Sequence, residues 1–322
     1  MATLADIAKA AKVSKAAVSY AFSNDSVKQA KLSAATLEHI LNTAKQLDYV
    51  PSWTARALAH QKSYNIALLL PENCTTNISG HYLGLFHGVS SAISESEYNL
   101  SVFFGCNEKF LQSVLHNRVD GIVVIASLNE SDAFSVFSNL NKPVVFLNRI
   151  APSICPKASS CRSDYAGWAN EVISDFLDKK LSSCQLFYRP ERNGDQEVLT
   201  LLANLCQMNN LKFTSFNRDE FTNLNNIDEK TGLIFCGSSP KIIDALSKSS
   251  SLNYVVLTSP EVFRLGNWDV KKLYFHNSED IGYNGVKILL DMIDKNSKAI
   301  NKTIPLIKKQ LVSLESKTKF EF

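Results

Sequence analysis

The residues with the clearest potential for chemistry lie in one short stretch near the start of the chain, from Ser14 to Phe22. At helical spacing this stretch has one apolar face, made of Ala17, Val18, Ala21 and Phe22. Its other face carries a cation, a methyl group, a hydroxyl and a phenol, on Lys15, Ala16, Ser19 and Tyr20. These groups cannot build a core, but they can contact phosphates and base edges in the major groove of DNA. We therefore interpret the helix as DNA-reading; the alternative is a solvated helix in a small helical cap.

The segments around this stretch predict a module of three short helices. Thr3 followed by Asp6 matches an N-cap with an acid three residues later, which opens a first helix. Ser14 is the expected N-cap of the second helix after a three-residue connection, which is the spacing of a helix-turn-helix. A polar loop over residues 23–31 leads to Ser33, the expected N-cap of a third helix. We expect these helices to form one module over residues 1–50.

A short connecting segment follows the module. The third helix is expected to end before Pro51, because proline cannot continue a helix and restricts the residue before it. Residues 52–59 are amphipathic, but they are too few to hold a helix alone in water. Residues 1–63 carry eight Lys and Arg against four Asp and Glu, a net charge of +4, which leaves −1 for the rest of the chain. This asymmetry indicates a polyanion partner for the module alone.

The remainder, residues 64–322, alternates between two patterns. Apolar runs typical of buried strands occur at residues 66–70, 100–104, 121–125, 144–147, 185–188, 233–236 and 255–257. Helical patterns lie between them, at residues 82–94, 110–116, 133–139, 167–177, 198–208, 242–247 and 281–293. Such alternation predicts an α/β fold with doubly wound parallel sheets. The length of this region favours two lobes with a cleft between them.

Several other protein classes are disfavoured. The seven cysteines are scattered singly without a C-x-x-C pair, which argues against disulfides and structural zinc. The six histidines are dispersed, and His81 and His87 are six residues apart, so no metal site is expected. Cys236 could act as a nucleophile, but a cysteine that ends a buried strand is usually a small apolar residue. We expect no enzyme, no cofactor and, without a long apolar run, no membrane partner and a cytoplasmic location.

The order of several motifs carries a family resemblance. Residues 3–8 (TLADIA), 13–19 (VSKAAVS), 49–51 (YVP) and 55–58 (ARAL) closely resemble the headpiece and hinge of the lactose-repressor (LacI/GalR) family of bacterial transcription regulators. The resemblance continues more weakly through residues 119–123, 143–149 and 164–167, so it spans nearly the whole chain. It implies a helix-turn-helix headpiece over residues 1–50, a hinge helix and linker over 51–63, and a two-lobed, periplasmic-binding-protein-like effector domain over 64–322.

The resemblance also implies how DNA is contacted. It implies a homodimer on a pseudo-palindromic double-stranded operator, with each headpiece reading one half-site in the major groove. Lys15, Ala16 and Tyr20 match the family's base-reading positions, and Ser14 and Ser19 would hold phosphates. The hinge would fold on DNA, where Leu58 matches the leucine that wedges into the minor groove. The other DNA-contacting candidates are Ala17, Ala55 and Arg56.

Some headpiece positions depart from the family pattern. Lys12 stands where the family usually has glycine in the turn between the first two helices. Ala17 replaces a common threonine and Tyr20 a common arginine, and the loop over residues 23–31 is longer than usual. These departures bear on which operator is read rather than on DNA binding itself.

The resemblance places a small-molecule effector in the cleft. Its candidate contacts are Tyr82, Arg149, Asp164, Gln196, Ser239 and Ser259. The last three stand where the family commonly has charged or amide groups, which weakens the case for an ordinary sugar as the effector. Asp164 could equally be a helix N-cap, and Arg149 could form a surface ion pair.

The sequence therefore predicts a DNA-binding transcription regulator, a repressor in the bacterial cytoplasm and associated with the nucleoid. An effector in the cleft, a sugar being one candidate, would shift operator affinity by linkage. Two alternatives stay open. A solute-binding protein with a vestigial headpiece would share the two-lobed fold, and a constitutive DNA binder would have a cleft that no longer senses a ligand.

Overall fold

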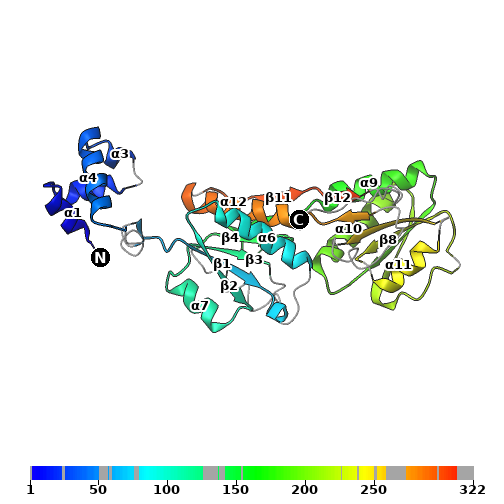
Figure 1. Ribbon diagram of the computed structural model, residues 1–322. Helices are drawn as coiled ribbons and strands as arrows, with labels where there is room; N and C mark the ends of the chain where they lie inside the picture. Colours follow the sequence, from blue (N-terminus) through cyan, green and yellow to red (C-terminus); the bar gives the residue numbers. More distant parts are fainter. Residues whose placement is uncertain are drawn as a thin grey trace. The chain divides into compact units, whose positions relative to one another are not determined.

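The computed structural model describes residues 2–23, 26–50, 57, 60–75, 80–125, 137, 142–153, 155–225, 227–237, 239–249, 252–258, 273–295 and 297–309. The chain forms two compact units, Met1–Ser63 and Tyr64–Phe322 (Figure 1). Most of the predicted hinge segment, and the predicted helix at residues 133–139 apart from Phe137, lie outside the described residues.

In its described residues the first unit contains the predicted three helices and one further helical turn: α1 (Leu4–Ala10), α2 (Lys15–Ala21), α3 (Ser26–Gln29) and α4 (Ala34–Gln46). Their common core is built around Ile7, Val18 and Ile40, which are completely buried. The three predicted N-caps, Thr3, Ser14 and Ser33, all accept a hydrogen bond from the backbone at the start of their helices.

The stretch predicted as a polar loop contains α3, so the loop prediction was incomplete. The turn is anchored to α2 because the Gln29 side-chain amide donates a hydrogen bond to the carbonyl oxygen of Ala21, at 3.3 Å. A single polar helical turn shows no apolar periodicity, which is why the pattern of this stretch indicated a loop.

The second unit contains two six-stranded sheets. The first has the order β11-β5-β4-β3-β1-β2 and is parallel throughout. Its strands are β1 (Asn65–Leu70), β2 (Asn99–Phe104), β3 (Gly121–Val124), β4 (Val144–Leu147), β5 (Ser159–Ser163) and β11 (Asn301–Ile304). The helices that pack on this sheet are α6 (Gly80–Ser94), α7 (Glu108–Leu115) and α12 (Ser278–Lys295).

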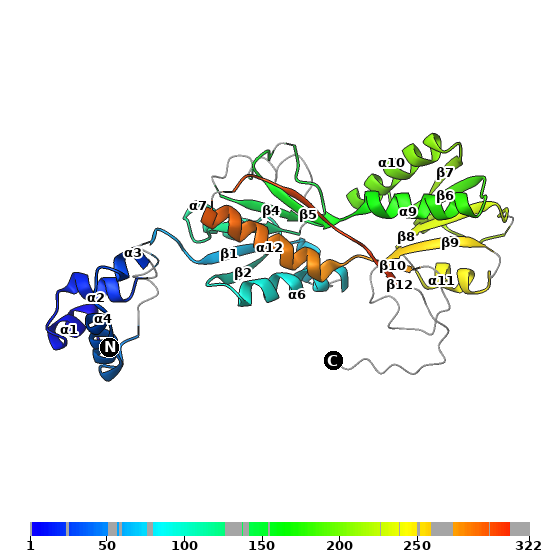
Figure 2. The same ribbon diagram turned by 90° about the horizontal axis from the view of Figure 1, so that it is seen from above.

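The second sheet has the order β12-β10-β9-β8-β6-β7, parallel except for β12, which pairs antiparallel with β10. Its strands are β6 (Ser183–Tyr188), β7 (Lys212–Asn217), β8 (Thr231–Cys236), β9 (Asn253–Thr258), β10 (Leu273–Phe275) and β12 (Ile307–Lys309). The associated helices are α9 (Tyr165–Asp178), α10 (Asn193–Met208) and α11 (Pro240–Ser247). Figure 2 shows the two lobes side by side, each with helices on both faces of its sheet.

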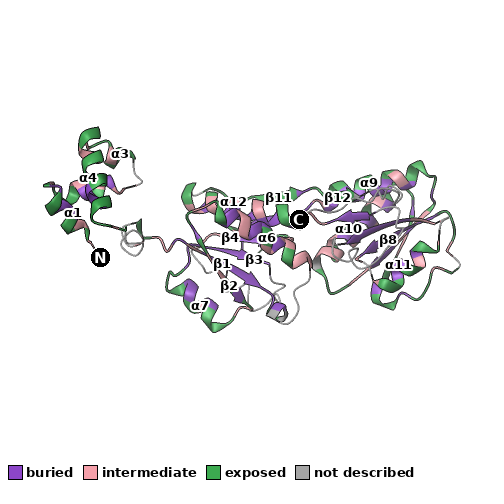
Figure 3. Cartoon of the chain, in the orientation of Figure 1, coloured by how far each residue is buried: buried purple, intermediate pink, exposed green. Residues whose placement is uncertain are grey.

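Alternation along the strands explains the layers. In β8, Ile234 joins the cluster beneath α9 and α10, whereas Phe235 joins the cluster beneath α11. Both side chains are completely buried, because each face of a parallel sheet is covered. Figure 3 shows this burial along the strands, with exposed residues gathered on the outer sides of the helices.

In the first lobe α6 and α12 pack at very short range. A Cβ atom on Gly88 would lie 1.9 Å from the backbone oxygen of Glu279, and one on Gly282 would lie 2.3 Å from the backbone oxygen of Leu85. Only glycine permits this approach. The contact places the start of α12 beside the start of α6, at the edge of the lobe where the chain crosses over.

Three crossovers join the lobes, and a polar network links two of them. They run from β5 to α9, from β10 to α12 and from β11 to β12. His81 Nε2 accepts a hydrogen bond from the Asn148 amide at 2.8 Å, so the neutral ring donates from Nδ1 to the Ser278 hydroxyl at 2.7 Å. The hydroxyl of Ser163 donates to Asn148 at 3.3 Å, so it accepts from Nδ1–H of His276 at 2.9 Å.

Both histidines are held neutral. Burial lowers the pKa of His81 to about 3, with further lowering by His276 and Arg192. Burial also lowers the pKa of His276 to about 4, again with help from Arg192. The ring centroids lie 5.1 Å apart, so protonation of either ring would place a charge beside the other.

A second structural constraint lies in the headpiece turn. Lys12, at the position where the resembling family usually has glycine, has φ +55°. This left-handed backbone is costly for any residue with a Cβ atom. We predict that Lys12→Gly raises the free energy of unfolding of the headpiece by about 0.5–1 kcal/mol. Slower amide hydrogen exchange at Val18 and Ile40 in the full-length protein would report the gain.

The matched control for this prediction is Lys9→Gly. Lys9 lies inside α1 and is exposed, so the same change there should cost about 1 kcal/mol through lost helix propensity. If Lys12→Gly speeds exchange as Lys9→Gly does, the backbone at position 12 does not carry the cost we assign to it.

The neutral histidines predict acid sensitivity of the two-lobed unit. Below about pH 6.5 the two histidines take up protons in the unfolded chain but stay neutral in the folded protein. The free energy of unfolding should therefore fall from that pH down to about pH 4. Each histidine contributes at most about 1.4 kcal/mol per pH unit. His276→Gln should therefore flatten the decline measured by urea unfolding between pH 6.5 and 5, and His81→Gln should do the same.

His116→Gln serves as the control, because His116 is exposed and lies outside the network. It should leave the pH dependence of stability unchanged. A wild-type slope retained in both network variants would show that these rings are not the source of the acid sensitivity.

Candidate functional site

The outer face of α2 is open to solvent as the sequence predicts. Lys15, Ala16 and Ser19 are exposed, while Tyr20 is partly covered by Lys31, whose ammonium lies 5.4 Å from the centre of the phenol ring. The face therefore carries one cation on α2, and the loop that follows α3 places a second over the Tyr20 ring. Both can approach a phosphate backbone.

Two other predicted DNA contacts have a structural task as well. Ser14 Oγ accepts the backbone N–H of Ala17 at 3.1 Å, which leaves its hydroxyl hydrogen available to donate to a phosphate. The side chain of Ala17 is partly buried and packs against the headpiece core. The remaining candidates, Ala55, Arg56 and Leu58, lie outside the described residues.

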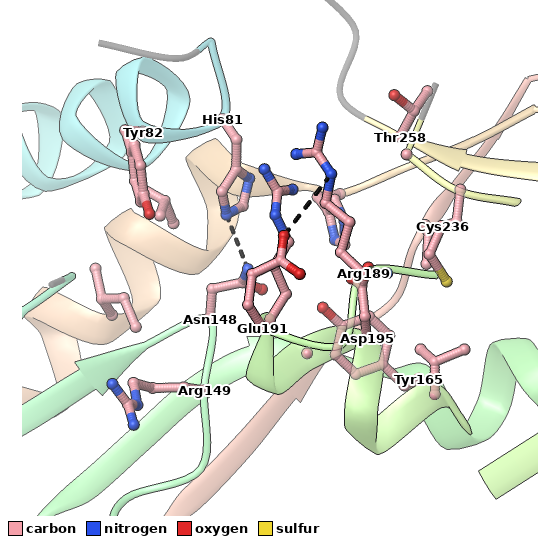
Figure 4. A pocket seen from close by; sticks show the side chains of 18 of the residues that line it. His81, Tyr82, Asn148, Arg149, Tyr165, Arg189, Glu191, Asp195, Cys236 and Thr258 are labelled. Atoms are coloured by element: carbon pink, nitrogen blue, oxygen red, sulfur yellow. Dashed lines mark hydrogen bonds and ion pairs between the residues drawn. The ribbon is translucent and has the colours of Figure 1, made fainter. Parts of the chain in front are cut away.

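A cavity of about 350 Å³ lies in the two-lobed unit. It is formed where strands of both sheets end: Leu147 closes β4, Cys236 closes β8 and Thr258 closes β9. The beginnings of α6 and α10 complete its walls, and Tyr165 and His276 contribute from the crossovers. This is the usual place for ligands in parallel α/β sheets, at the carboxyl ends of the strands. Figure 4 shows the lining side chains.

The cavity contains two of the six predicted effector contacts, Tyr82 and Arg149. Ser259 lies outside the described residues. The other three do not line the cavity, because each makes a local backbone contact elsewhere. Asp164 accepts the N–H of Gly167 at 3.0 Å as the N-cap of α9, Ser239 accepts the N–H of Ile242 at 3.3 Å as the N-cap of α11, and Gln196 donates to the Pro190 oxygen at 2.8 Å.

The main polar residues of the cavity were missed in the sequence. Arg189, Glu191, Arg192, Asp195 and Arg218 all line it, together with His81, Asn148 and His276. The available signal was the run Arg189-Pro190-Glu191-Arg192 directly after a predicted strand, at the edge where ligands bind. Arg218 could not have been paired with it, because the two segments meet only through the alignment of β6 with β7.

Two of the cavity arginines, Arg189 and Arg218, hydrogen-bond to the same carboxylate, that of Asp219. Arg218 is only 5% exposed, and it donates to the Cys236 oxygen at 3.1 Å and to Asp219 at 3.3 Å. The same Asp219 oxygen accepts from Nε of Arg189 at 3.1 Å. Burial, followed by repulsion from Arg189, lowers the pKa of Arg218. Two guanidinium groups thus share one exposed carboxylate.

The cavity acids are tied to the loop that carries Arg189. Asp195 accepts the backbone N–H of Arg189 at 2.9 Å, and burial raises the pKa of Asp195 against the lowering effect of the surrounding arginines. Glu191 lies 4.0 Å from Nε of Arg189 and is largely exposed (Figure 4). Of the arginines, Arg192 contributes most by its charge to the lowering of the Asp195 pKa, but no ion pair or hydrogen bond joins the Arg192 side chain to either acid.

Gly237 makes room for this arrangement. It has φ +81°, which favours glycine, and a Cβ atom there would lie 2.0 Å from a terminal nitrogen of Arg218. Its neighbour Cys236 is not an activated nucleophile, because burial raises the pKa of its thiol well above the usual value.

Two further features are absent from the described part of the chain. There, no group of three or more His, Cys, Asp and Glu side chains could hold a metal ion. Within the same residues, no helix combines the length and the apolar character needed to cross a membrane.

Known proteins resemble the chain in two ways. Residues 3–52 match the family described as bacterial regulatory proteins, lacI family. The chain is 35% identical over 150 residues to a probable HTH-type transcriptional repressor, ExuR, of Bacillus subtilis, covering 46% of this chain and 44% of that protein. It is 32% identical over 183 residues to a ribose operon repressor of Halalkalibacterium halodurans, covering 54% and 50%. The chain thus spans about half the length of these relatives.

Solved structures extend the likeness in fold to the whole chain. The lac repressor bound to ONPG in its repressed state aligns over 96% of this chain and 98% of its own, with TM-score 0.64 and 16% identity. A complex of the transcriptional regulator CelR with cellobiose aligns over the same shares with TM-score 0.60 and 14% identity. The predicted fold class, a helix-turn-helix headpiece with a two-lobed periplasmic-binding-protein-like unit, is confirmed. The headpiece motifs, the capped helices and the matches at both levels agree: residues 3–52 match the lacI family of bacterial regulatory proteins, and the chain shares its fold with the lac repressor.

Proposed function

We propose that the protein is a sequence-specific DNA-binding transcription regulator that acts as a repressor. The observation that carries the proposal is the exposed face of α2, with Lys15 and Ser19 presented on a helix whose other side is locked into the headpiece core. A helix held by its inner face can enter a major groove without losing its support. We assign residues 1–50 to the headpiece, 51–63 to a hinge and 64–322 to the effector-binding unit.

The protein would bind a pseudo-palindromic operator as a homodimer in the cytoplasm, near the nucleoid. Ser14 and Ser19 would contact phosphates, Lys15, Ala16 and Tyr20 would contact base edges, and Leu58 would enter the minor groove. The cavity of about 350 Å³ would hold a small-molecule effector. An effector that binds one arrangement of the lobes more tightly would shift operator affinity, and DNA would shift effector affinity equally.

A non-sensing cleft is the second candidate, since Gln196 and Ser239 do not line the cavity. The cluster of arginines that does line it favours a retained ligand. A solute-binding protein with a vestigial headpiece is disfavoured by the capped, fully packed helix-turn-helix.

The test of DNA reading is selection of bound sequences from random DNA by the purified full-length protein at near-physiological salt. We expect a two-fold-related motif with half-sites about one helical turn apart. No enriched motif, with or without candidate effectors present, would overturn the proposal.

Within that motif, Lys15→Ala should relax or shift base preference in each half-site. The loss of one base contact should weaken binding to the selected site roughly 10–100-fold, with much less effect on unrelated DNA. Competition between the selected site and single-base variants, measured by fluorescence anisotropy, would show the change.

Lys45→Ala is the matched control, because Lys45 is exposed on α4 and not on the α2 face. It should leave base preference unchanged. A uniform loss for Lys15→Ala on all sequences, with a reduced salt dependence, would instead assign Lys15 to a phosphate.

A further inference from the structure

We propose that the cavity takes a small polyhydroxylated anion, bearing a carboxylate or a phosphate group, and not a neutral sugar. The anionic group would bind Arg192 and the start of α10, and a ligand hydroxyl would donate to His276. This inference rests on the proposed effector function of the cavity and names the chemical class of that effector.

The first argument is charge. The lining includes four arginines, Arg149, Arg189, Arg192 and Arg218, but only two acids, Glu191 and Asp195. Asp219, which lies outside the lining, already bridges Arg189 and Arg218. Among the described residues the guanidinium of Arg192 has no hydrogen-bond acceptor and no ion-pair partner. An added anion would supply the missing counterion.

The second argument is the start of α10, a helix of 16 residues. Arg192 occupies its N-cap position, and no side chain caps the helix. The backbone N–H groups of Gly194 and Asp195 have no acceptor among the described residues, and both residues line the cavity. Free N–H groups and the helix dipole attract a negative group to this point. Arg192, the N-cap residue of the same helix, lines the cavity together with Gly194 and Asp195.

The positive charge of Arg192 acts on three other side chains that line the cavity. Arg192 contributes to lowering the pKa of His81, of His276 and of Arg218. These groups come from α6, from the crossover after β10 and from the turn after β7. The electrostatic field of Arg192 therefore extends across the cavity that it lines, where it would attract an anionic ligand.

The third argument is the neutral histidine. His276 uses Nδ1–H on the Ser163 hydroxyl, so its Nε2 is a hydrogen-bond acceptor. Nε2 has no partner among the described residues, and the ring lines the cavity. An acceptor at this point requires a donor on the ligand, which a carboxylate or phosphate lacks and a hydroxyl provides. The ligand must therefore carry both an anionic group and hydroxyls.

Size sets the remaining limit. A volume of about 350 Å³ is near the lower end of the range for small-molecule sites. Tyr82 and Tyr165 bring aromatic rings to the same cavity, which suits the apolar face of one sugar-like ring. We infer a single ring or a short chain of similar size.

The experiment is isothermal titration calorimetry of the full-length protein with three ligands that share one ring: glucose, glucuronate and glucose 6-phosphate. We expect at least one anion to bind tenfold or more tightly than glucose, and the anion that does so identifies the group as carboxylate or phosphate. Inorganic phosphate, which has no hydroxyl-bearing ring, should bind more weakly than glucose 6-phosphate if the phosphate ester is the one bound. Glucose binding as tightly as the tighter-binding of the two anions, or no binding of any anion at millimolar concentration, would overturn the proposal.

The variants locate the anionic group. Arg192→Gln should weaken the anion by about tenfold or more, and Arg192→Lys, which keeps the charge but not the forked donors, should lie between Gln and wild type. Arg118→Gln is the control, because Arg118 is exposed before the amino end of β3 and does not line the cavity. Equal anion affinity in wild type and Arg192→Gln overturns the assignment.

The outcome can be separated from that of the proposed function. A protein that selects a DNA motif but fails to prefer an anion refutes only the ligand class. A protein that prefers an anion but selects no DNA motif refutes the regulator and leaves a solute-binding protein.

Discussion

The two-lobed unit depends on backbone pairing between strands that lie far apart in the sequence. Near the end of the described chain, β11 pairs with β5 in the first sheet, and β12 pairs with β10 in the second. Since α12 and β11 belong to the first lobe and β12 to the second, the chain must cross between lobes three times. Each sheet therefore includes a strand that follows most of the other lobe in the sequence. The crossovers therefore lie together at one edge, and the cavity forms beside them.

This constraint explains why polar side chains are buried around the crossovers between the lobes. The crossover segments carry backbone and side-chain groups that cannot be exposed to water once the lobes are built, and buried polar groups need partners. The network through His81, Asn148, Ser163 and His276 provides them. Three of these residues, His81, Asn148 and His276, also line the cavity. The neutral rings of the two histidines therefore also determine which hydrogen bonds a ligand can make. The hydrogen bonds that satisfy the buried crossover groups thus also set the donors and acceptors that the cavity offers to a ligand.

The headpiece was the part most open to prediction from sequence. Thr3, Ser14 and Ser33 cap their helices as expected, since capping is decided by neighbours three residues away. The predicted strands of the larger unit that carry long apolar runs are also present, as in β1 and β4. By contrast β5 was missed, because it buries serines such as Ser160, whose hydroxyl donates to Asn301. β11 was missed because its residues are mostly exposed and polar.

Sequence by itself determined the fold class, the family resemblance and the exposed surface of α2, because each depends on local periodicity and motif order. The tertiary structure alone decided the cavity lining. Asp164 and Ser239 are polar residues that follow strands, yet they cap helices, while Arg192 and Arg218 reach the cavity from separate segments. Their meeting depends on how β6, β7 and β8 align in the sheet. Pairing over such distances is set by packing of the whole lobe, and no local pattern records it.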